Sequence, residues 1–392
     1  MAATATTPPP SDNVTTLGWT AFWSGMAQEM VYPLLPIFLV VALSSSTTAL
    51  GAVEGLLGVG VTIARLWTGR RLDRGGSPLR LTRISYAISL AARPLIALAP
   101  TVAVVAILRV ADGLGKGGKD APKAVLVAAD ADPARLGRSF GIQTLLDTLG
   151  SVAGPAIAGL VLLAAGHGED GLRLCFALAA IPAIGALHNL RRAHDAPPAR
   201  PPGDAAREPL GRPFRVLMVA VLIFGLANSS DTLLLLRARE SGLSASDLAF
   251  LFAAFNLVYA LLAVPIGSLS DRVGRRPLIF LAWGVYVAVY VGFAFAQDTW
   301  LLVALFLGYG VFYAAADGVI KAWVTTLVPE DRRGRAFGLN AAASGLLLLP
   351  ASVIAGVLWD TAGSQAAFLF GAIMATAALA VVALSPTLRR AA

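Results

Sequence analysis

Among the acidic residues inside the long apolar stretches of this chain, Glu29, Glu54, Asp147 and Asp231 carry the most functional information. A charged side chain in apolar surroundings is costly unless it is paired or hydrated. Each acid therefore marks either a functional site or a buried ion pair that only fixes how helices pack. Glu29 is the stronger functional candidate, because it lies mid-stretch and is followed by two prolines that disturb regular helical hydrogen bonding. For Glu54 both interpretations stay open.

Arginines in the same stretches are the natural partners of these acids. Arg93 and Arg109 lie too deep to be explained as charges at a membrane surface, whereas Arg65 is close enough to a helix end to reach water. Charged residues at spacings of three or four share one helix face, and one such stripe consists of Arg109, Asp112, Lys116, Asp120 and Lys123. Within it we expect an ion pair between Asp112 and Lys116. The stripe fits either an aqueous vestibule or a hydrated helix end.

Long apolar helices must position these residues. Hydrophobic residues make up 57% of the 392 residues, charged residues 14%, and the mean hydropathy is +0.72, too apolar for an ordinary soluble domain. Twelve stretches approach or exceed the roughly 20 residues that a helix needs to cross a bilayer. They are 17–43, 48–69, 80–99, 101–121, 138–164, 171–190, 214–236, 245–268, 277–296, 300–322, 335–358 and 364–384. They lack the alternation of barrel strands. We predict an all-α polytopic membrane protein with twelve transmembrane helices.

Basic residues are distributed unevenly between the two predicted faces. Of the 31 Lys and Arg residues, 25 fall on the face with both termini, three lie within spans, and three lie on the opposite face (Arg173, Arg237 and Arg239). This positive-inside pattern predicts a multi-pass protein of the cytoplasmic (inner) membrane with both termini in the cytoplasm. The net charge of +8 then needs no nucleic-acid partner.

The chain is predicted to consist of two bundles of six helices each, at 17–190 and 214–385. They are joined by a Pro-rich cytoplasmic linker at 191–213, which lacks apolar periodicity. The segment 1–16 is predicted to be a disordered cytoplasmic N-terminus, without the basic region of a cleaved signal peptide. The segment 386–392 is predicted to be a cytoplasmic tail.

Two short charged loops repeat about half a chain length apart, which indicates a duplicated architecture. The first loop contains Gly69, Asp73 and Arg74, and the second contains Gly267, Asp271, Arg272 and Arg275.

With these loop motifs the chain resembles the major facilitator superfamily. The resemblance extends over nearly the whole chain. The family's loop signature, G-x-x-x-D-R-x-G-R-[RK], is met in full by residues 267–276, whereas Ser77 and Pro78 replace the basic pair in the first copy. The family's helix 4 pattern, R-x-x-x-G-x-G, is met by Arg109, Gly113 and Gly115. Its helix 5 exporter pattern, G-x-x-x-G-P-x-x-G-G, is met by Gly150, Gly154, Pro155 and Gly159, with Ala158 replacing one glycine. The resemblance implies alternating access, in which one central site is exposed to each side in turn.

The resemblance also implies that the loop motifs act as a conformational switch. Asp73 would meet the N-terminus of the helix that begins near Gly334, and Asp271 that of the helix beginning near Gly137. The helix dipole and free backbone N–H groups stabilise a carboxylate at such a place. These contacts would hold the cytoplasmic side closed. The alternative is that the Asp-Arg pairs only end helices and set topology.

In this family helices 1, 4, 7 and 10 line the cavity, and 2, 5, 8 and 11 flank it. The implied proton or substrate pathway consists of Glu29, Glu54, Arg93, Arg109, Asp112, Asp147, Asn228 and Asp231. Because burial penalises a charged carboxylate, proton binding at Glu29 or Asp147 would couple to substrate exchange. The helix 5 pattern favours proton-coupled efflux of a small molecule over proton-coupled uptake or facilitated diffusion.

Other classes of function find little support. One cysteine and three dispersed histidines predict no metal site, no cofactor and no enzymatic centre, and a sensor would need a soluble domain. The expected partners are a small-molecule substrate, protons and the lipid bilayer, with a monomer as the expected state. The charge of the substrate stays open. The buried acids would suit a cation, and the buried arginines would suit an anion. If the acids and arginines neutralise one another, neither inference holds.

Overall fold

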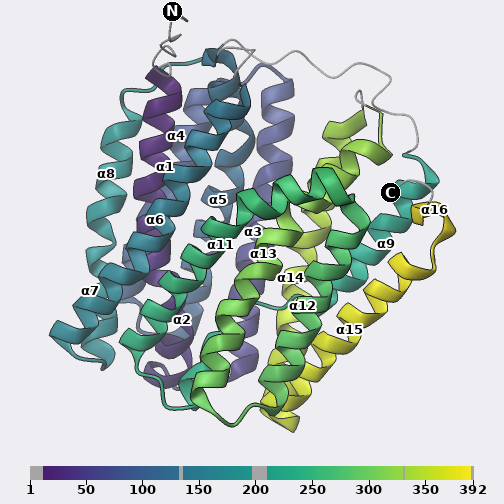
Figure 1. The fold of residues 1–392 in the computed structure, drawn as a ribbon. Coiled ribbons are helices and arrows are strands. Elements are labelled where there is room, and N and C mark those ends of the chain that lie inside the picture. The colour runs from purple at the N-terminus through teal and green to yellow at the C-terminus, as the bar shows by residue number, and fades with distance from the viewer. Residues whose placement is uncertain (1–11, 132–135, 197–209, 330–331, 390–392) are drawn as a thin grey trace, which may run out of the picture.

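A computed structural model describes residues 12–131, 136–196, 210–329 and 332–389, whose regular structure is entirely helical (Figure 1). The helices of the first half are α1 (Asp12–Val31), η1 (Tyr32–Leu34), α2 (Leu35–Ile37), η2 (Phe38–Ala42), α3 (Thr47–Asp73), α4 (Pro78–Leu95), η3 (Ile96–Leu98), α5 (Val102–Asp130), α6 (Leu136–Ala165), α7 (Glu169–Leu178) and α8 (Ala180–Leu190). Those of the second half are α9 (Arg212–Ala227), α10 (Thr232–Glu240), α11 (Ala245–Val273), α12 (Arg275–Phe295), α13 (Thr299–Leu327), α14 (Arg333–Ala362), α15 (Ser364–Leu384) and α16 (Pro386–Arg389).

Eleven segments of the described chain are long and apolar enough to cross a membrane. The helix α5 is not among them, although its 29 residues equal the length of α13. The charged stripe makes the sequence of α5 less hydrophobic. Nevertheless, α5 packs along both α3 and α4 as a member of the bundle. The predicted fold class, an all-α polytopic membrane protein, is therefore confirmed, and α5 is the helix whose position depends on how its charges are paired.

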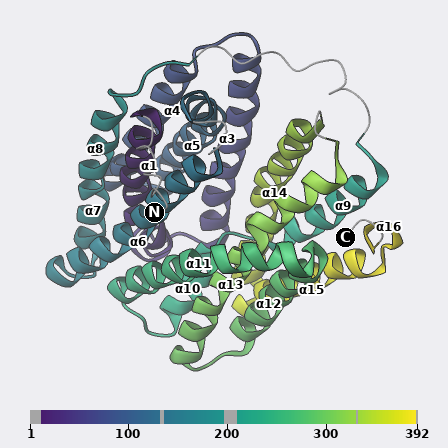
Figure 2. The same ribbon diagram turned by 45° about the horizontal axis from the view of Figure 1, so that its top comes forward.

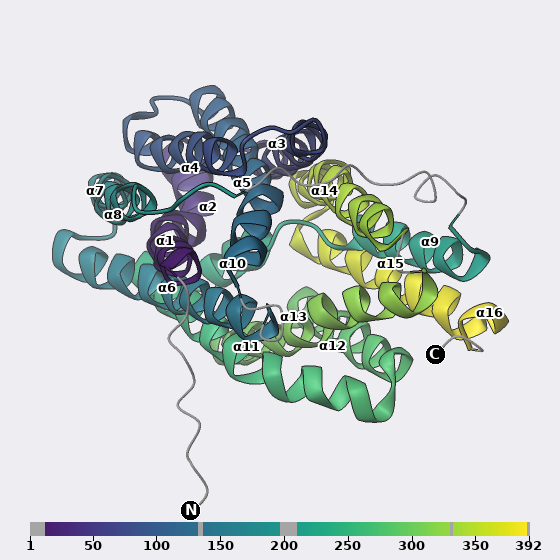
Figure 3. The same cartoon turned by 90° about the horizontal axis from the view of Figure 1, so that it is seen from above.

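The helices form two groups that meet along two helix pairs. Figures 2 and 3 show α1 and α3–α8 on one side and α9 and α12–α16 on the other. Between the groups, α3 packs on α14 and α6 packs on α11. The predicted division at 191–213 stays a prediction, because residues 197–209 lie outside the described ranges, as do most of the predicted N-terminal segment and the last three residues of the predicted tail.

The pair α3 and α14 runs antiparallel, and its contact covers only part of each helix. At one end Thr47 meets Asp360, and further along Thr62 meets Gly345. Beyond that point the last turns of α3 and the first turns of α14 stand apart (Figure 2). We call the end at Thr47 and Asp360 the closed end, and the end at Asp73 and the start of α14 the open end.

Small residues make the closed end possible. A Cβ atom added to Gly51 would lie 2.1 Å from the carbonyl oxygen of Ser352, and one added to Gly345 would lie 2.2 Å from Oγ1 of Thr62. Neither site has room for a larger side chain, so the two helix backbones approach closely, as small residues allow in membrane proteins.

Of the predicted spans that are not regular α-helices, two contain acidic residues of the predicted pathway. The span at 17–43 passes through a 3₁₀ turn at Tyr32–Leu34 and a π turn at Phe38–Ala42, in the segment that contains its two prolines. The span at 214–236 was expected to be continuous but is interrupted between Ala227 and Thr232. The interrupting sequence Asn-Ser-Ser-Asp consists of residues whose side chains compete with helical backbone hydrogen bonds.

Candidate functional site

Glycines on α5 bring two neighbouring helices unusually close. A Cβ atom at Gly113 would lie 2.3 Å from the carbonyl oxygen of Leu57 on α3, and one at Gly115 would lie 2.5 Å from that of Ser85 on α4. Only glycine permits such an approach of one backbone to another. The polar residues on the same turns of α5 are consequently buried between α3 and α4.

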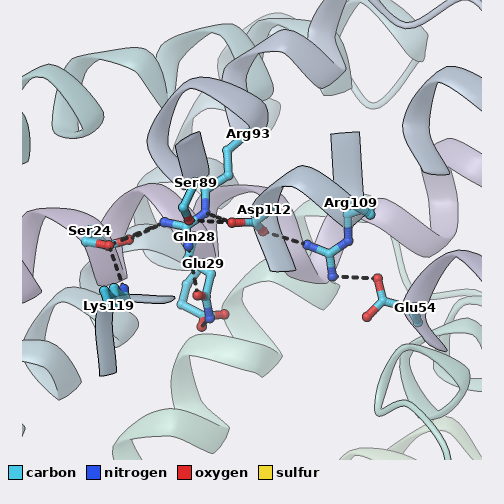
Figure 4. A network of polar contacts seen from close by, with 9 residues as sticks. All are labelled: Ser24, Gln28, Glu29, Glu54, Ser89, Arg93, Arg109, Asp112 and Lys119. Atoms are coloured by element: carbon cyan, nitrogen blue, oxygen red, sulfur yellow. Dashed lines mark hydrogen bonds and ion pairs between the residues drawn. The ribbon is translucent and has the colours of Figure 1, made fainter. Parts of the chain in front are cut away.

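Four charged side chains form a continuous chain of ion pairs there (Figure 4). The Nε atom of Arg93 on α4 is 3.0 Å from Oδ1 of Asp112. Arg109 places Nη1 3.1 Å from Oδ2 of Asp112, and Nη2 2.7 Å from Oε1 of Glu54 on α3. All four side chains are at most 3% exposed. Two positive and two negative charges therefore neutralise each other within the bundle, and for Glu54 this favours the ion-pair interpretation.

The chain of polar contacts continues from Arg93 to α1. Arg93 donates to the backbone oxygen of Ser24 at 2.9 Å and to Oε1 of Gln28 at 3.1 Å. Gln28 in turn donates to Oε1 of Glu29 at 2.7 Å. The second carboxylate oxygen of Glu29, Oε2, is buried without a hydrogen-bond partner among the described residues. Glu29 is thus the end of the network, with one oxygen free to accept a proton or a ligand (Figure 4).

The other end of the network reaches the second half of the chain. Ser230, in the interruption between α9 and α10, donates to Oε2 of Glu54 at 3.4 Å. Its backbone N–H donates to Oγ of Ser352 on α14 at 3.0 Å. The interruption of this helix thus places a residue of the second half in direct contact with the ion-pair chain of the first.

Asp231 lies beside this contact but has different partners. The hydroxyl groups of Tyr309 and Tyr313, one turn apart on α13, donate to its two carboxylate oxygens at 2.9 and 2.7 Å. Asn228, at the start of the same interruption, is half-buried, and its Oδ1 has no partner. The predicted pathway residues thus fall into an arginine-paired group in the first half and a tyrosine-bound acid in the second.

Two expectations about charges are corrected by the structure. Asp112 pairs with Arg93 and Arg109, not with Lys116 as its spacing suggested, because the tight approach of α4 brings an arginine directly onto Asp112. Asp147 was expected to be a buried acid, but its side chain is exposed on the face of α6 that adjoins α1. It lies near Gly25, where no larger side chain separates the two helices.

The remaining stripe on α5 points along the bundle toward the open end. Asp120 pairs with Arg65 at 2.7 Å, with both side chains about two-fifths exposed. Lys119 donates to Oγ of Ser24 at 3.3 Å and lies 4.6 Å from the centre of the Tyr86 ring. The stripe thus changes from fully buried pairs to partly exposed ones along a single helix.

Comparison with known proteins assigns the family. The family model described as Major Facilitator Superfamily matches residues 17–238 and 217–391, which is nearly the whole chain. The chain belongs to the major facilitator superfamily. It is 29% identical over 371 residues to an uncharacterized MFS-type transporter of Methanocaldococcus jannaschii, covering 93% of this chain and 92% of that protein. It is also 29% identical over 349 residues to the multidrug resistance protein MdtG of Salmonella paratyphi C, covering 83% of each.

A solved structure shows the same fold. The peptide transporter POT, solved in complex with sulfate, superposes with a TM-score of 0.79 at 15% identity, covering 97% of this chain and 96% of that one. The family match, with this fold, makes the protein a multi-pass membrane transporter of the superfamily. At this identity the likeness concerns the fold alone.

The superfamily's loop motif is described structurally only in its first copy. Asp73 and Arg74 are exposed, and Gly69 has no atom within 4 Å of an added Cβ. Asp73 makes no hydrogen bond or ion pair with any residue of the described ranges. The expected contact of Asp73 near Gly334 stays a prediction, because the surroundings of Gly334 lie outside the described part of the structure.

In the second copy most side chains lie outside the described part of the structure. This applies to Gly267, Asp271 and Arg272, although their backbone belongs to α11. Arg275, at the start of α12, is half-buried. The switch role of both motifs stays a prediction.

The helix 5 motif of the superfamily packs in two directions. Gly150 and Gly154 face α1, where added Cβ atoms would lie 2.1 and 2.5 Å from backbone oxygens, and Gly159 faces the Phe250 ring on α11. Pro155 is buried inside α6. The motif therefore sets both the contact of α6 with the helix that carries Glu29 and its contact with the second half.

Ser24, Gln28, Ser89 and Tyr309 escaped the sequence analysis, although local spacing could have indicated them. Ser24 and Gln28, Ser89 and Arg93, and Tyr309 and Tyr313 are pairs four residues apart, which places each pair on one helix face. Ser89 donates to Asp112 at 2.5 Å. Within the described residues no group of three His, Cys, Asp or Glu side chains is placed to hold a metal ion.

Proposed function

We propose that this transporter exports a small molecule in exchange for protons, with Glu29 as the proton carrier. The observation that supports this most directly is the buried, unpartnered Oε2 atom of Glu29. Because that oxygen has no existing partner, a proton can bind there without displacing a contact. The same carboxylate is hydrogen-bonded to Gln28 through its other oxygen, so its charge state acts on the rest of the network.

The proposed coupling runs through hydrogen bonds already present. Protonation of Glu29 removes the negative charge that orients the amide of Gln28, and Gln28 is also held by Arg93. Arg93 shares Asp112 with Arg109. The signal therefore reaches Glu54, whose contact with the second half must break or re-form when the two halves rock.

From the charge pattern we propose how the protein is oriented in the membrane and which parts of it move. The open end, with its basic loops, faces the cytoplasm, and both termini lie there in the inner membrane. The bundles at 17–190 and 214–385 move as two bodies within a single chain. In the present conformation substrate would then enter from the cytoplasm, and the closed end at Thr47 and Asp360 would separate to release it.

Export is favoured over uptake by two observations. The helix 5 motif resembles that of exporters in the superfamily, and the chain is similar to a protein named for multidrug resistance. Proton movement distinguishes the directions of coupling. In liposomes loaded with a pH-sensitive dye, substrate entering through an antiporter drives protons out, whereas a symporter brings them in and a facilitator leaves the internal pH unchanged.

A substrate found by thermal-shift screening of the purified protein would be used in this assay. Glu29→Gln keeps the shape of the side chain and removes the titration, so the substrate-driven pH change should be lost. Substrate exchange without a gradient should survive if Glu29 carries only the proton. Asp147→Asn, an exposed acid, tests the other expected carrier. Glu169→Gln, in a surface pair with Arg173, is the matched control and should behave like the wild type. Wild-type coupling by Glu29→Gln at every pH tested would refute the assignment.

A further inference from the structure

The interruption between α9 and α10 directs one carboxylate away from its own helix. Asp231 occupies the N-cap position of α10, where an aspartate commonly accepts a hydrogen bond from the first turn. Its side chain makes no such bond. Both of its oxygens are bound instead by the hydroxyl groups of Tyr309 and Tyr313 on another helix. The acid is therefore held in position by α13 and is not needed to cap α10.

Asp231 differs in charge balance from the other acids near it. Glu54 and Asp112 are paired with arginines at 2.7–3.1 Å, but no ion pair involves Asp231 among the described residues. Lys116 of the first half acts on it only electrostatically, outside ion-pair distance. Hydroxyl donors stabilise an anion without neutralising it. A negative charge in the transporter interior thus lacks a protein cation at contact distance.

Aromatic rings from both halves adjoin the two tyrosines that bind this carboxylate. The Tyr313 ring lies 5.3 Å from that of Tyr309 and 5.5 Å from that of Phe255 on α11, measured between centroids. From the first half, Tyr32 lies 5.4 Å from Phe252. Asp231, Tyr32 and Tyr313 are each only half-buried. Aromatic faces attract cations, and more strongly where water is excluded.

The site lies where the two halves meet. The helix α10 contacts α2 and η1 of the first half as well as α11 and α13 of the second, as its central place in Figure 3 indicates. Ser230, the residue before Asp231, contacts Glu54 across the same junction. A ligand bound at Asp231 would therefore touch both halves and change its surroundings as they rock.

We propose that Asp231, Tyr309, Tyr313, Phe255 and Tyr32 form the binding site for the positively charged group of an organic cation with an aromatic or apolar body. This rests on the proposed function in that the cation would be the exported substrate. On this proposal the substrate carries a positive charge, because the arginines that would have suited an anion are neutralised by Glu54 and Asp112. A metal ion fits less well, since both carboxylate oxygens already accept a hydrogen bond from a tyrosine hydroxyl.

Equilibrium binding of tetraphenylphosphonium tests the site, because this aromatic cation cannot lose its charge. Purified full-length protein in nanodiscs should bind it at least about tenfold more tightly than neutral triphenylphosphine oxide, because aromatic faces beside an unpaired carboxylate attract a cation and not a neutral molecule. Asp231→Asn should lose about tenfold or more in affinity, and Asp231→Glu should retain most of it. Glu169→Gln should bind like the wild type.

Equal affinity of wild-type protein for the charged and neutral probes would overturn the proposal without depending on any variant. So would unchanged binding by Asp231→Asn that is folded by thermal unfolding. The measurement uses no proton gradient and no transport. Binding can therefore fail while proton-coupled export of another solute survives, and Glu29→Gln should still bind the probe even where coupling is lost.

Discussion

Asp360 holds the closed end together through the start of a helix in the other half. Its carboxylate accepts hydrogen bonds from the backbone N–H groups of Thr47 at 3.0 Å and Thr48 at 2.8 Å, and from the Thr48 hydroxyl at 2.6 Å. Ser46 caps the next free N–H of α3, that of Ala49. Asp360 thus satisfies two of the backbone donors that every helix N-terminus leaves open. We predict that Asp360→Asn weakens the closed end selectively.

The magnitude follows from helix capping. Loss of an N-cap acceptor costs about 0.5–2 kcal/mol, and loss of a carboxylate charge at an exposed helix N-terminus costs about 0.3–1 kcal/mol. Asparagine retains one acceptor oxygen and Asp360 is exposed, so a value near 1 kcal/mol is expected. Because a tenfold change corresponds to about 1.4 kcal/mol, the population of the present conformation should fall about fivefold relative to the alternative.

Asp73 provides the matched opposite perturbation. Asp73 is the last residue of α3, and Asp360 lies near the end of α14. The two helices are antiparallel, and the spacing is the same in both. Asp73 lies 26 residues after Thr47, and Asp360 lies 26 residues after Gly334. Closing the open end in the same register would therefore bring Asp73 to the start of α14. Asp73→Asn should shift the equilibrium toward the present conformation, and the double variant should restore the wild-type balance.

Spin labels at Leu66 on α3 and Leu339 on α14 would measure this equilibrium. Both side chains are exposed near the open end, at 48% and 45%, and the single native cysteine can be removed as Cys175→Ala. The long-distance population should fall in Asp360→Asn and rise in Asp73→Asn. A shift of both variants in the same direction, or none in Asp360→Asn, would refute the capping argument.

Three further predictions concern stability. Gly51→Ala adds a Cβ 2.1 Å from the Ser352 carbonyl oxygen, so overpacking should lower the stability by about 1–3 kcal/mol and be visible as a lower Tm. Arg93→Met leaves Asp112 buried without its α4 partner and should cost about 3–5 kcal/mol by thermal unfolding. Partial burial alone would raise the pKa of Asp195, but hydrogen bonds from the start of α4 hold it below its ordinary value. Its stabilisation, present at neutral pH, should be lost as the pH falls below about 4, and Asp195→Asn should flatten that part of the Tm–pH curve.

Each of these has an outcome that contradicts it. Gly69→Ala is the control for the first, since no atom lies within 4 Å of its added Cβ, and equal Tm losses in both variants would remove the steric explanation. Combining Arg93→Met with Asp112→Leu should recover stability, and no recovery would mean that the arginine acts otherwise than by pairing. If Asp195→Asn leaves the low-pH part of the Tm–pH curve unchanged, this carboxylate contributes nothing to folding stability.

The sequence was sufficient for the fold because lipid leaves few alternatives. Apolar stretches of membrane length must be helices there, and each predicted span falls on helical segments, although α5 continues nine residues beyond the predicted 101–121. The interruption before Thr232 was missed because the flanking stretches are apolar on both sides. The run Asn228 to Asp231 is a weak helix former, and that was the available signal.

Local sequence spacing could not predict which charged residues pair within the site. The spacing of Asp112 and Lys116 suits a pair along one helix, but the partner that prevails comes from α4. What decides the pairing is the close approach that Gly113 and Gly115 permit, which is a property of three helices together. The contact of Asp360 with α3 was equally invisible, because it joins residues 313 positions apart.

The distribution of charge between the halves has a mechanistic consequence. The first half holds Arg93 and Arg109 in a neutral network with Asp112 and Glu54. That network ends at Glu29, which has one free oxygen, whereas the second half holds an acid bound only by tyrosines among the described residues. On the proposals above, proton and cation would bind on different bodies, and Glu54 with Ser230 would connect them. Because Glu29 and Asp231 lie in different halves, the proton and the cation would not compete for one carboxylate. Each ligand could then change the free energy of the rocking motion by itself. Coupling would then depend on the Glu54–Ser230 contact, so Ser230→Ala should loosen coupling while leaving cation affinity at Asp231 intact.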